Sequence, residues 1–384
     1  SSNSAFGAGT LQANTTGSSN TAVGESSLYA NTTGYYNTAV GPNALATNTD
    51  GTYNTAVGMN ALYYGASSVR NAALGFGAGY NNTGSYNCYM GWYAGAGNTS
   101  GSRNIAIGYN SLGGVSGGGA VEDNTAVGHS ALGALTTGYQ NTAVGFWSMY
   151  SSTTGFDNTA FGNQTLYTNT TGSYNTAVGF QALYYNTTGT DNCAFGFQAL
   201  RNNTTGGSNH AFGESALTAN TTGTANIAVG VLALTTSTTA SYNTAIGAYY
   251  VGIGAGALGK ATTGGYNTAI GCGAAGTLTT GSGNVVIGLI AGASMTTTTQ
   301  AVCIGYSADV GAADNYAIVI GSSVTSKGAS TGFISPNSGG VYQGNNSSTW
   351  SQTSDQRLKK NIVDNNTGLE KITAIQVRNF EYRL

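Results

Sequence analysis

Residues 175–191 read NTAVGFQALYYNTTGTD, and residues 192–208 read NCAFGFQALRNNTTGGS, which is the same phrase a second time. The Gly that closes the Asn-Thr-Ala-Val-Gly part recurs 19 times between Gly7 and Gly321. Successive copies are 17 residues apart, except for two intervals of 16, one of 20 and one of 24. We number the consensus unit N-T-A-V-G-x-x-A-L-x-x-N-T-T-G-x-Y from position 1 to position 17. This repeat, rather than any single motif, decides the fold.

The length of the unit excludes most repeat folds. Seventeen residues are too few for a repeat that carries a helix, and the unit lacks the i, i+3, i+4 apolar spacing of a helix. It suits one coil of a parallel β-solenoid (β-roll), with two short strands and two turns marked by Gly. We therefore expect an all-β rod of about 19 coils over residues 1–321. At about 4.8 Å per coil, such a rod is roughly 90 Å long.

Apolar residues recur at three positions of the unit. Position 4 is always large and apolar, position 3 is nearly always Ala, and position 9 is usually Leu: Leu11, Leu28, Leu45, Leu62, Leu112, Leu132, Leu166, Leu183, Leu200, Leu217, Leu234 and Leu258. We expect positions 4 and 9 to form two continuous ladders that make the core. Because positions 3 and 4 point to opposite faces of a strand, the strand is apolar on both sides. The second face needs cover, which predicts a homo-oligomer and favours a homotrimer.

The composition narrows the class of protein. Charged residues make up 6% of the chain, against roughly 25% in ordinary globular domains. The net charge of −2, without a basic stripe, gives no support for nucleic-acid binding. No apolar run approaches the roughly 20 residues of a membrane span. The periodic 40% of hydrophobic residues argues against disorder, and the Asn at position 1 predicts a ladder of buried side-chain amides.

Neither a metal site nor a cofactor is predicted. The four cysteines form no CxxC pair, and Cys88 and Cys193 share one repeat position six copies apart. That separation is roughly 29 Å along the rod, too far for a disulfide within one chain, so we expect small buried side chains. His129 and His210 occupy different repeat positions, which gives no metal-ligand set. The acidic residues of the repeats are mostly solitary, so no paired carboxylates predict a hydrolase.

The irregular intervals and the C-terminal part define the remaining organisation. Extra residues within 113–123 and 248–254 predict two outward loops, because insertions in solenoids map to surface turns. Residues 322–350 are polar and rich in Gly and Ser, as in a neck or linker. Ten of the 24 charged residues lie in the last 34, so residues 351–384 form a different, short α+β segment.

Aromatic residues at the outward turns are the main candidates for recognition. Flat rings beside Asn and Thr suit a glycan-binding surface, although they also suit packing between coils. The candidates are Tyr63, Tyr64, Trp92, Trp147, Tyr184, Tyr185, Tyr249 and Tyr250. Asn-Thr-Thr triplets match the N-glycosylation pattern at Asn14, Asn31, Asn169, Asn186, Asn203 and Asn220, where a secreted eukaryotic protein would carry sugars. Thr ladders at positions 2, 13 and 14 raise a third, weaker hypothesis, an ice-binding face.

Two parts of the chain resemble known families. The phrases Asn104-Ile-Ala-Ile-Gly108 and Asn243-Thr-Ala-Ile-Gly247 resemble the coils of YadA-like trimeric autotransporter heads, which are left-handed β-rolls. The stretch Ser354-Asp-Gln-Arg-Leu-Lys-Lys-Asn-Ile362, with Gly368-Leu-Glu-Lys-Ile372 and Phe380-Glu-Tyr-Arg383, resembles the start of the intramolecular chaperone domain of phage tail spikes and endosialidases.

The second resemblance implies a trimeric fibre whose C-terminal domain guides assembly. In many members this domain then cuts itself off, and the matching residues here are Ser354 as nucleophile and Lys359 as its base. The alternative is an uncut structural cap. A desolvated Lys can activate a Ser without a histidine, so the implied single-turnover chemistry is reasonable.

The sequence therefore predicts a non-enzymatic structural and adhesive fibre segment without a cofactor. We expect a phage tail fibre or spike on the virion that binds a host cell-surface glycan, with other fibre proteins on its N-terminal side. The alternative is a bacterial adhesin or extracellular surface filament that has the same rod.

Overall fold

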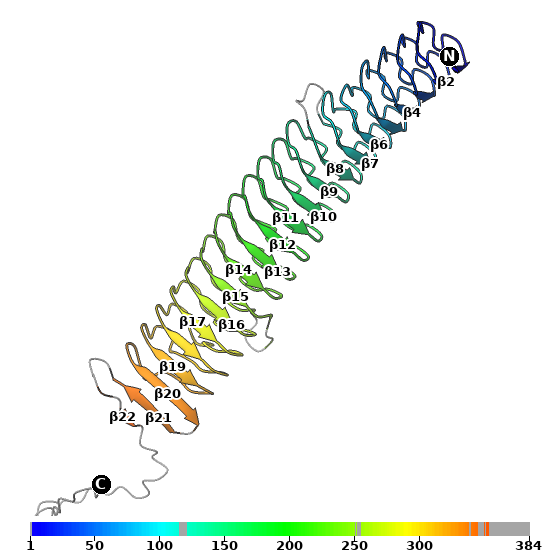
Figure 1. Ribbon diagram of the computed structural model, residues 1–384. Helices are drawn as coiled ribbons and strands as arrows, with labels where there is room; N and C mark the ends of the chain where they lie inside the picture. The colour runs from blue at the N-terminus through cyan, green and yellow to red at the C-terminus, as the bar shows by residue number, and fades with distance from the viewer. Residues whose placement is uncertain are drawn as a thin grey trace, which may run out of the picture.

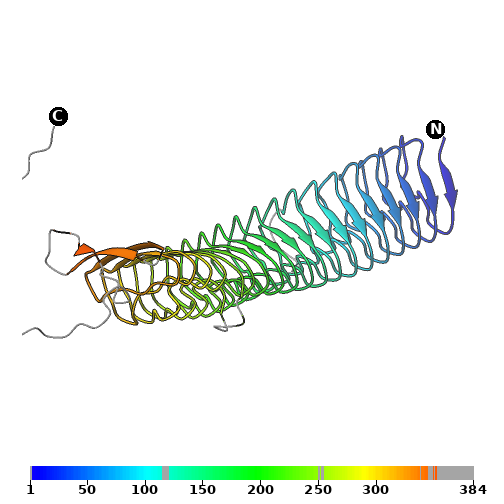
Figure 2. The same ribbon diagram turned by 90° about the horizontal axis from the view of Figure 1, so that it is seen from below.

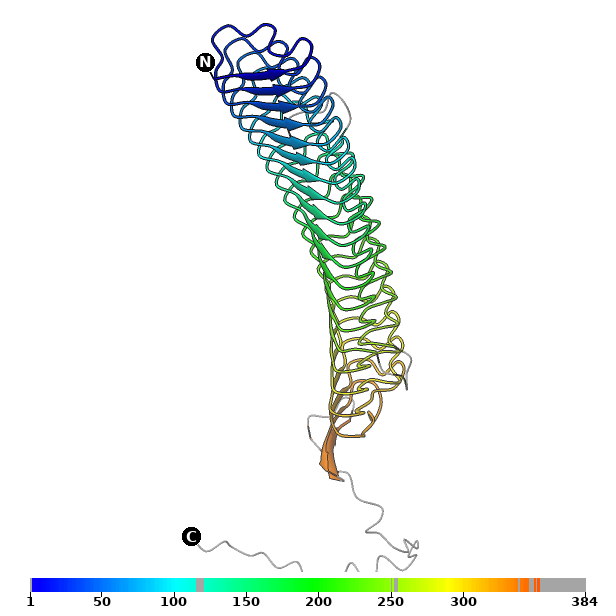
Figure 3. The same cartoon turned by 90° about the vertical axis from the view of Figure 1, so that its right-hand side faces the viewer.

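The computed structural model describes residues 2–114, 121–249, 251, 255–337, 339–344, 349 and 351–352. The chain forms a long rod of stacked coils (Figure 1). It is an all-β parallel solenoid of about 19 coils with a period of about 17 residues, which confirms the predicted fold class. Figure 2 shows the strands in one row along a side of the rod, and Figure 3 shows that this row turns gradually about the axis, as twisted sheets do.

Each coil contributes one short strand, and three strands that follow Gly321 complete a single sheet of 22 strands in the described residues. The strands are β1 (Ser4–Phe6), β2 (Thr21–Val23), β3 (Thr38–Val40), β4 (Thr55–Val57), β5 (Ala72–Leu74), β6 (Cys88–Met90), β7 (Ile105–Ile107), β8 (Thr125–Val127), β9 (Thr142–Val144), β10 (Thr159–Phe161), β11 (Thr176–Val178), β12 (Cys193–Phe195), β13 (His210–Phe212), β14 (Ile227–Val229), β15 (Thr244–Ile246), β16 (Thr268–Ile270), β17 (Val285–Ile287), β18 (Val302–Ile304), β19 (Ile318–Gly321), β20 (Gly332–Asn337), β21 (Gly339–Gln343) and β22 (Ser351–Gln352).

The register follows the repeat and survives the insertions. Neighbouring strands from β1 to β20 are parallel, and Ala177 in β11 pairs with Ala194 in β12. Across the interval of 24 residues, Ala245 still pairs with Ala269, so the extra residues leave the ladder intact. Within the two predicted loops, residues 115–120, 250 and 252–254 lie outside the described residues.

The second strand expected in each coil is absent from the described coils. Position 9 has a left-handed backbone instead, with φ of 52° at Leu183 and 51° at Leu200. A left-handed residue other than Gly costs about 1–2 kcal/mol. Hydrogen bonds between coils hold it there, because the amide of Leu183 donates to the carbonyl of Ala199 at 3.0 Å. The chain therefore turns where an extended strand was expected.

The core consists of the Ala at positions 3 and 8 and the Leu at position 9, whose side chains are fully buried in nearly every coil. The predicted Leu ladder is confirmed. The predicted ladder at position 4 is wrong, because these side chains point outward, and Phe161 is 48% exposed. A strand of three residues turns its middle one inward, and the narrow coil accepts Ala there opposite Leu.

Tyr89 demonstrates how narrow the interior is. It replaces the usual Ala at position 3 and is fully buried. Position 9 is Gly79 in the preceding coil and Gly95 in the same coil, in place of the usual Leu. A Cβ on Gly95 would collide with the Tyr89 ring. The hydroxyl accepts from Nδ2 of Asn98 at 2.8 Å and donates to Oδ1 of Asn82 at 3.1 Å. Burial raises the pKa of this phenol far above its ordinary value.

The Asn at position 1 forms the predicted amide ladder. Oδ1 of Asn175 accepts from both the backbone N–H and Nδ2 of Asn192, each at 3.1 Å. Nδ2 of Asn175 donates to the carbonyl of Gly189 at 2.9 Å. These side chains are buried, so each amide satisfies polar groups that water does not reach.

A second ladder occupies position 12. Nδ2 of Asn203 donates to Oδ1 of Asn186, and Nδ2 of Asn220 donates to Oδ1 of Asn203, each at 2.8 Å. This ladder ends where the repeat changes. Position 12 of the next coil is Ser237, and Oδ1 of Asn220 has no hydrogen-bond partner among the described residues. The same holds for Oδ1 of Asn48, where position 12 of the next coil is Gly65.

We expect Asn175→Ala to lower the free energy of unfolding by about 3 kcal/mol, because it leaves the buried amide of Asn192 without an acceptor. Asn163 is exposed and makes no side-chain hydrogen bond to a described residue, so Asn163→Ala should change stability by less than about 0.5 kcal/mol. Guanidinium unfolding of both variants measures the difference. Equal effects would contradict the structural role of the ladder.

The sheet continues beyond Gly321. Strand β20 pairs in parallel with β19, and β21 and β22 then extend the sheet in antiparallel order. The segment 322–350, interpreted from sequence as a neck, thus contributes strands to the end of the rod. Residues 353–384, which hold most of the predicted chaperone-like segment, lie outside the described residues.

Candidate functional site

An apolar strip runs along the outside of the rod. It consists of positions 4 and 6, which flank the Gly at position 5 in each coil. Its exposed members are Phe6, Val23, Val40, Met59, Leu74, Met90, Trp92, Tyr109, Phe146, Phe161, Phe180, Phe195, Phe197, Phe212, Val229, Val231, Ile246, Ile270, Leu289, Tyr306 and Ile320. They leave on the order of 1,000 Å² of largely apolar surface exposed in the single chain, more than soluble monomers usually present.

Aromatic rings at the same position of successive coils stack on one another. At position 10, the ring centroids of Tyr150 and Tyr167 are 5.5 Å apart and those of Tyr167 and Tyr184 are 5.0 Å apart, with nearly parallel planes. The Arg201 guanidinium continues this column, 5.6 Å from the Tyr184 centroid. Burial and the neighbouring phenols raise the pKa of Tyr184.

The structure places three other predicted aromatic residues, Tyr63, Tyr64 and Trp147, against neighbouring rings. Tyr63 stacks on Tyr80 at 5.4 Å, and Tyr64 meets Tyr63 edge-on at 4.8 Å. Trp147 contacts the position-10 column, 5.9 Å from Tyr167. Three further candidates lie elsewhere: Trp92 in the apolar strip, where it stacks on Phe76, Tyr185 edge-on to Tyr184, and Tyr249, which is exposed. Tyr250 lies outside the described residues.

Stacking limits what these columns offer to a ligand. Inside a column, each ring covers much of the face of its neighbour, so edges and hydroxyl groups form most of the outer surface. A sugar that packs against a ring needs an open face. Open faces remain where a column is interrupted.

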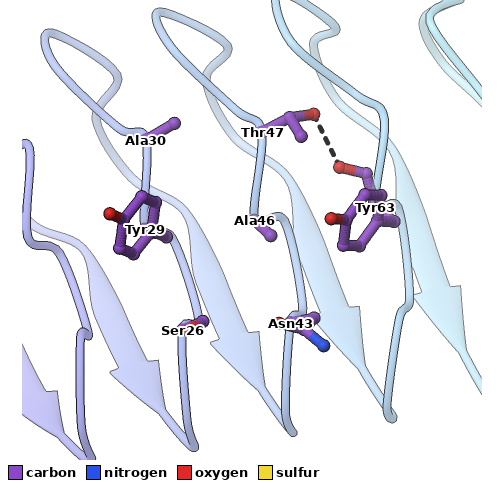
Figure 4. A pocket seen from close by; sticks show the side chains of 7 residues that line it. All are labelled: Ser26, Tyr29, Ala30, Asn43, Ala46, Thr47 and Tyr63. Carbon is purple, nitrogen blue, oxygen red and sulfur yellow. Dashed lines mark hydrogen bonds between the residues drawn. The ribbon is translucent and has the colours of Figure 1, made fainter.

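One such interruption forms a pocket near the N-terminal end of the rod. Position 10 is Tyr in Tyr29 and Tyr63 but Ala in Ala46, the coil between them. The resulting hollow of about 380 Å³ is lined by Ser26, Tyr29, Ala30, Asn43, Ala46, Thr47 and Tyr63 (Figure 4). Figure 4 shows the two rings on either side of the short Ala46 side chain.

A column at position 17 was missed by sequence reasoning. Arg70 lies between Tyr53 and Tyr86, with its guanidinium 5.5 and 5.4 Å from their ring centroids, and its Nη1 donates to the Tyr86 hydroxyl at 2.8 Å. Tyr36 stacks on Tyr53 at 5.2 Å. Aligning the repeats by position, instead of searching for clusters along the chain, would have found this column.

Three of the few charged side chains on the described rod form one ion-pair cluster. Arg103 contacts Glu122 at 2.8 Å and Asp123 at 2.6 Å. The guanidinium hydrogen bonds hold the pKa of the Asp123 carboxyl below its ordinary value. All three side chains are largely exposed, and the carboxylates are occupied by this ion pair. The arrangement resembles a surface salt bridge and not a hydrolase centre.

The Asn-Thr-Thr triplets have a structural role. Asn31, Asn169, Asn186, Asn203 and Asn220 are fully buried in the position-12 ladder. Their Nδ2 atoms, to which a glycan would be attached, donate to neighbouring amides and carbonyls. Asn14, in the first coil, is half-buried and its Nδ2 donates to the carbonyl of Gly17 at 3.1 Å. The folded coil thus has no room for a sugar at the five buried amides.

The Thr of these triplets is also engaged. Oγ1 of Thr187 donates to the carbonyl of Thr204 at 3.0 Å, and Thr204 repeats the bond to Thr221. The hydroxyl groups of position 13 therefore join coils, and they do not form a free, flat array of the kind an ice-binding face needs.

The cysteines are free thiols. Only Cys303 is fully buried, and burial raises its pKa to about 12. Cys88, Cys193 and Cys272 are half-buried, which differs from the expectation of buried side chains. No group of three His, Cys, Asp or Glu side chains among the described residues could hold a metal ion. The same part of the chain contains no apolar helix of membrane-spanning length.

The predicted self-cleavage pair, Ser354 and Lys359, lies outside the described residues. Comparison with family models, with curated proteins and with solved structures found no match to this chain.

Proposed function

We propose that the chain is the rod of a homotrimeric extracellular fibre that has both structural and adhesive roles. The observation that carries the proposal is the apolar strip, which continues along the rod on a chain with only 6% charged residues. A lone rod with this surface would associate in water, because contiguous apolar patches of this size mark interaction sites.

The size of the strip supports lateral assembly between copies. Stable protein interfaces bury about 800 Å² per partner, which the exposed strip matches in order of magnitude. Because the strip follows the rod axis and repeats with every coil, a second copy of the same rod provides a complementary surface of the same length. The resemblance to trimeric β-roll heads favours three copies around one axis.

The same resemblances support a place on a virion or a cell surface. The C-terminal stretch that includes Ser354 and Lys359 resembles assembly chaperones of phage tail spikes, which favours a phage tail fibre or spike that binds a host glycan. A bacterial adhesin or surface filament is the alternative. An image of the native particle, with the rod on a virion or on a cell envelope, decides between them.

Replacing strip residues by Asp should dissociate the assembly. We expect sedimentation of the full chain to give three times the chain mass of 38.5 kDa, and the double variant Phe195→Asp/Phe212→Asp to give one chain mass. Tyr185→Asp is the control, because Tyr185 is 41% exposed, similar to Phe195 at 37%, but lies off the strip.

The mass measurement is decisive in either direction. A wild-type chain that sediments as a monomer would overturn the proposal, and so would a strip variant that keeps the wild-type mass. Circular dichroism of the variants confirms that the coils remain folded.

A further inference from the structure

The pocket at Ala46 lies between two tyrosines of the position-10 column. Positions 10 and 7 form adjacent outer columns, and in coils 141–191 position 10 holds three successive stacked tyrosines. Around Ala46 the column instead reads Tyr29, Ala46, Tyr63. The missing ring leaves a slot whose two walls are aromatic side chains and whose floor is the buried Ala46.

The width of the slot follows from the coil spacing. Two coils separate the walls, so equivalent atoms of Tyr29 and Tyr63 are about 9.6 Å apart along the rod. A flat aromatic ring held between two others needs about 7 Å, at carbon–carbon contacts of about 3.5 Å. The slot is wider than that and fits a thicker, saturated ring. Its volume of about 380 Å³ lies within the range of small-ligand sites.

The lining is polar at its edge and carries no charge. The side chains of Ser26 and Asn43 line the slot and make no hydrogen bond to a described residue, so their groups are available to a ligand. The hydroxyl of Thr47 is already engaged, because it donates to the carbonyl of Tyr63 at 2.7 Å. Figure 4 shows this bond at one wall of the slot and the Ser26 and Asn43 side chains beside its floor. A neutral ligand that carries hydroxyl or amide groups suits this surface.

We propose that the slot binds one pyranose ring of a neutral glycan, held between Tyr29 and Tyr63. This inference rests on the adhesive role proposed above and names the site and the sugar class. A ring between two aromatic walls needs C–H groups on both faces. In β-linked glucose and N-acetylglucosamine all ring substituents are equatorial, so both faces present C–H groups. A galactose-type ring places an axial oxygen, O4, on one face, and the slot disfavours it.

The experiment compares defined oligosaccharides on the full chain. Saturation-transfer NMR and calorimetry with tetrasaccharides of β-1,4-glucose and of β-1,4-N-acetylglucosamine should detect binding, at least tenfold stronger than with the β-1,4-galactose tetrasaccharide. Ala46→Tyr completes the column and should abolish binding. It should fold, because Tyr150, Tyr167 and Tyr184 already occupy position 10 in three successive coils.

Two further variants keep the result interpretable. Thr235→Tyr adds a ring at position 10 in a distant coil and should bind like the wild type. Tyr63→Leu removes one wall without filling the slot and should weaken binding at least tenfold.

The possible failures are distinguishable. If Ala46→Tyr binds as the wild type does, or if the galactose tetrasaccharide binds equally well, the slot is not the site, although adhesion by another surface stands. If the wild-type chain binds none of the tetrasaccharides, the proposal that the slot binds a sugar is wrong. The mass measurement still tests lateral assembly independently in every case.

Discussion

Gly179→Ala should unfold the coils around residue 179 and leave distant coils folded. Gly179 occupies position 5 with φ +125°, a backbone conformation that residues with a side chain rarely adopt. A Cβ there would lie 2.5 Å from the carbonyl oxygen and 2.8 Å from the carbonyl carbon of Gly196 in the next coil. Neither the positive φ at residue 179 nor the backbone of Gly196 can adjust to a side chain. We therefore expect the free energy of unfolding of these coils to fall by more than about 4 kcal/mol.

Hydrogen exchange measures this effect coil by coil. Because each coil contacts only its neighbours, protection should be lost near residues 162–213 and retained near residues 20–58. Gly207→Ala is the matched control, since position 16 holds Ser173 and Thr190 in the two preceding coils and a Cβ at 207 meets no atom closer than 3.1 Å. Uniform loss of protection along the rod would contradict the nearest-neighbour account.

Tyr89→Ala should be the most destabilising single truncation in the core, at about 3–5 kcal/mol. Tyr89 fills space that Leu occupies in other coils, and Gly79 and Gly95 cannot fill it. The reverse change, Gly95→Leu alone, should also destabilise, because the new side chain collides with the Tyr89 ring. Its backbone is suitable for Leu, since φ is +65° at Gly95 and about 50° at the leucines of position 9.

A combined variant tests whether the Tyr89 ring and the side chains at position 9 occupy the same space. Tyr89→Ala with Leu at both 79 and 95 restores the consensus interior and should recover most of the stability, within about 1 kcal/mol of the wild type. Guanidinium unfolding of the single and combined variants measures the coupling. If the effects simply add, Tyr89 does not share its space with position 9.

Much of the fold could be predicted because the repeat gives the same information many times. The Gly spacing identified the coils, Leu183 and its equivalents identified half of the core, and Asn175 and its equivalents predicted a buried amide ladder. Each of these features depends on the same residue type at the same position of successive coils. Because the coils stack in register, such equivalent residues contact each other.

The orientation of the strand could not be predicted from the same pattern. Ala177 and Val178 are both apolar, and size suggested that Val belongs inside. The interior is only as wide as Ala opposite Leu183, and this width depends on the left-handed turn at Leu183, which propensity does not reveal. The alternation within the strand then turns Val178 outward.

The sequence predicted which types of residue lie on the outer surface, but it did not predict how they are arranged there. Tyr63 and Tyr184 lie on the outer surface region as expected, but most of their ring faces are covered by Tyr80, Tyr167 and Arg201. The slot at Ala46 depends on the absence of a ring, which a search for aromatic residues overlooks. The Asn-Thr-Thr triplets matched a modification motif, whereas burial of Asn186 assigns its amide to the ladder.

The hydrogen bonds between coils have a mechanical consequence. The amide of Tyr185 donates to the carbonyl of Arg201 at 2.9 Å, and the amide of Gly196 donates back to the carbonyl of Val178 at 2.9 Å, so bonds in both directions join these coils along the rod. Tension along the rod therefore breaks the bonds between one pair of coils before it loads the next pair. It does not load the bonds of many coils in shear at once. Each layer that opens frees 17 residues, about 60 Å of extended chain. A fibre built in this way would lengthen in steps under load and absorb a pull that would otherwise reach its attachment.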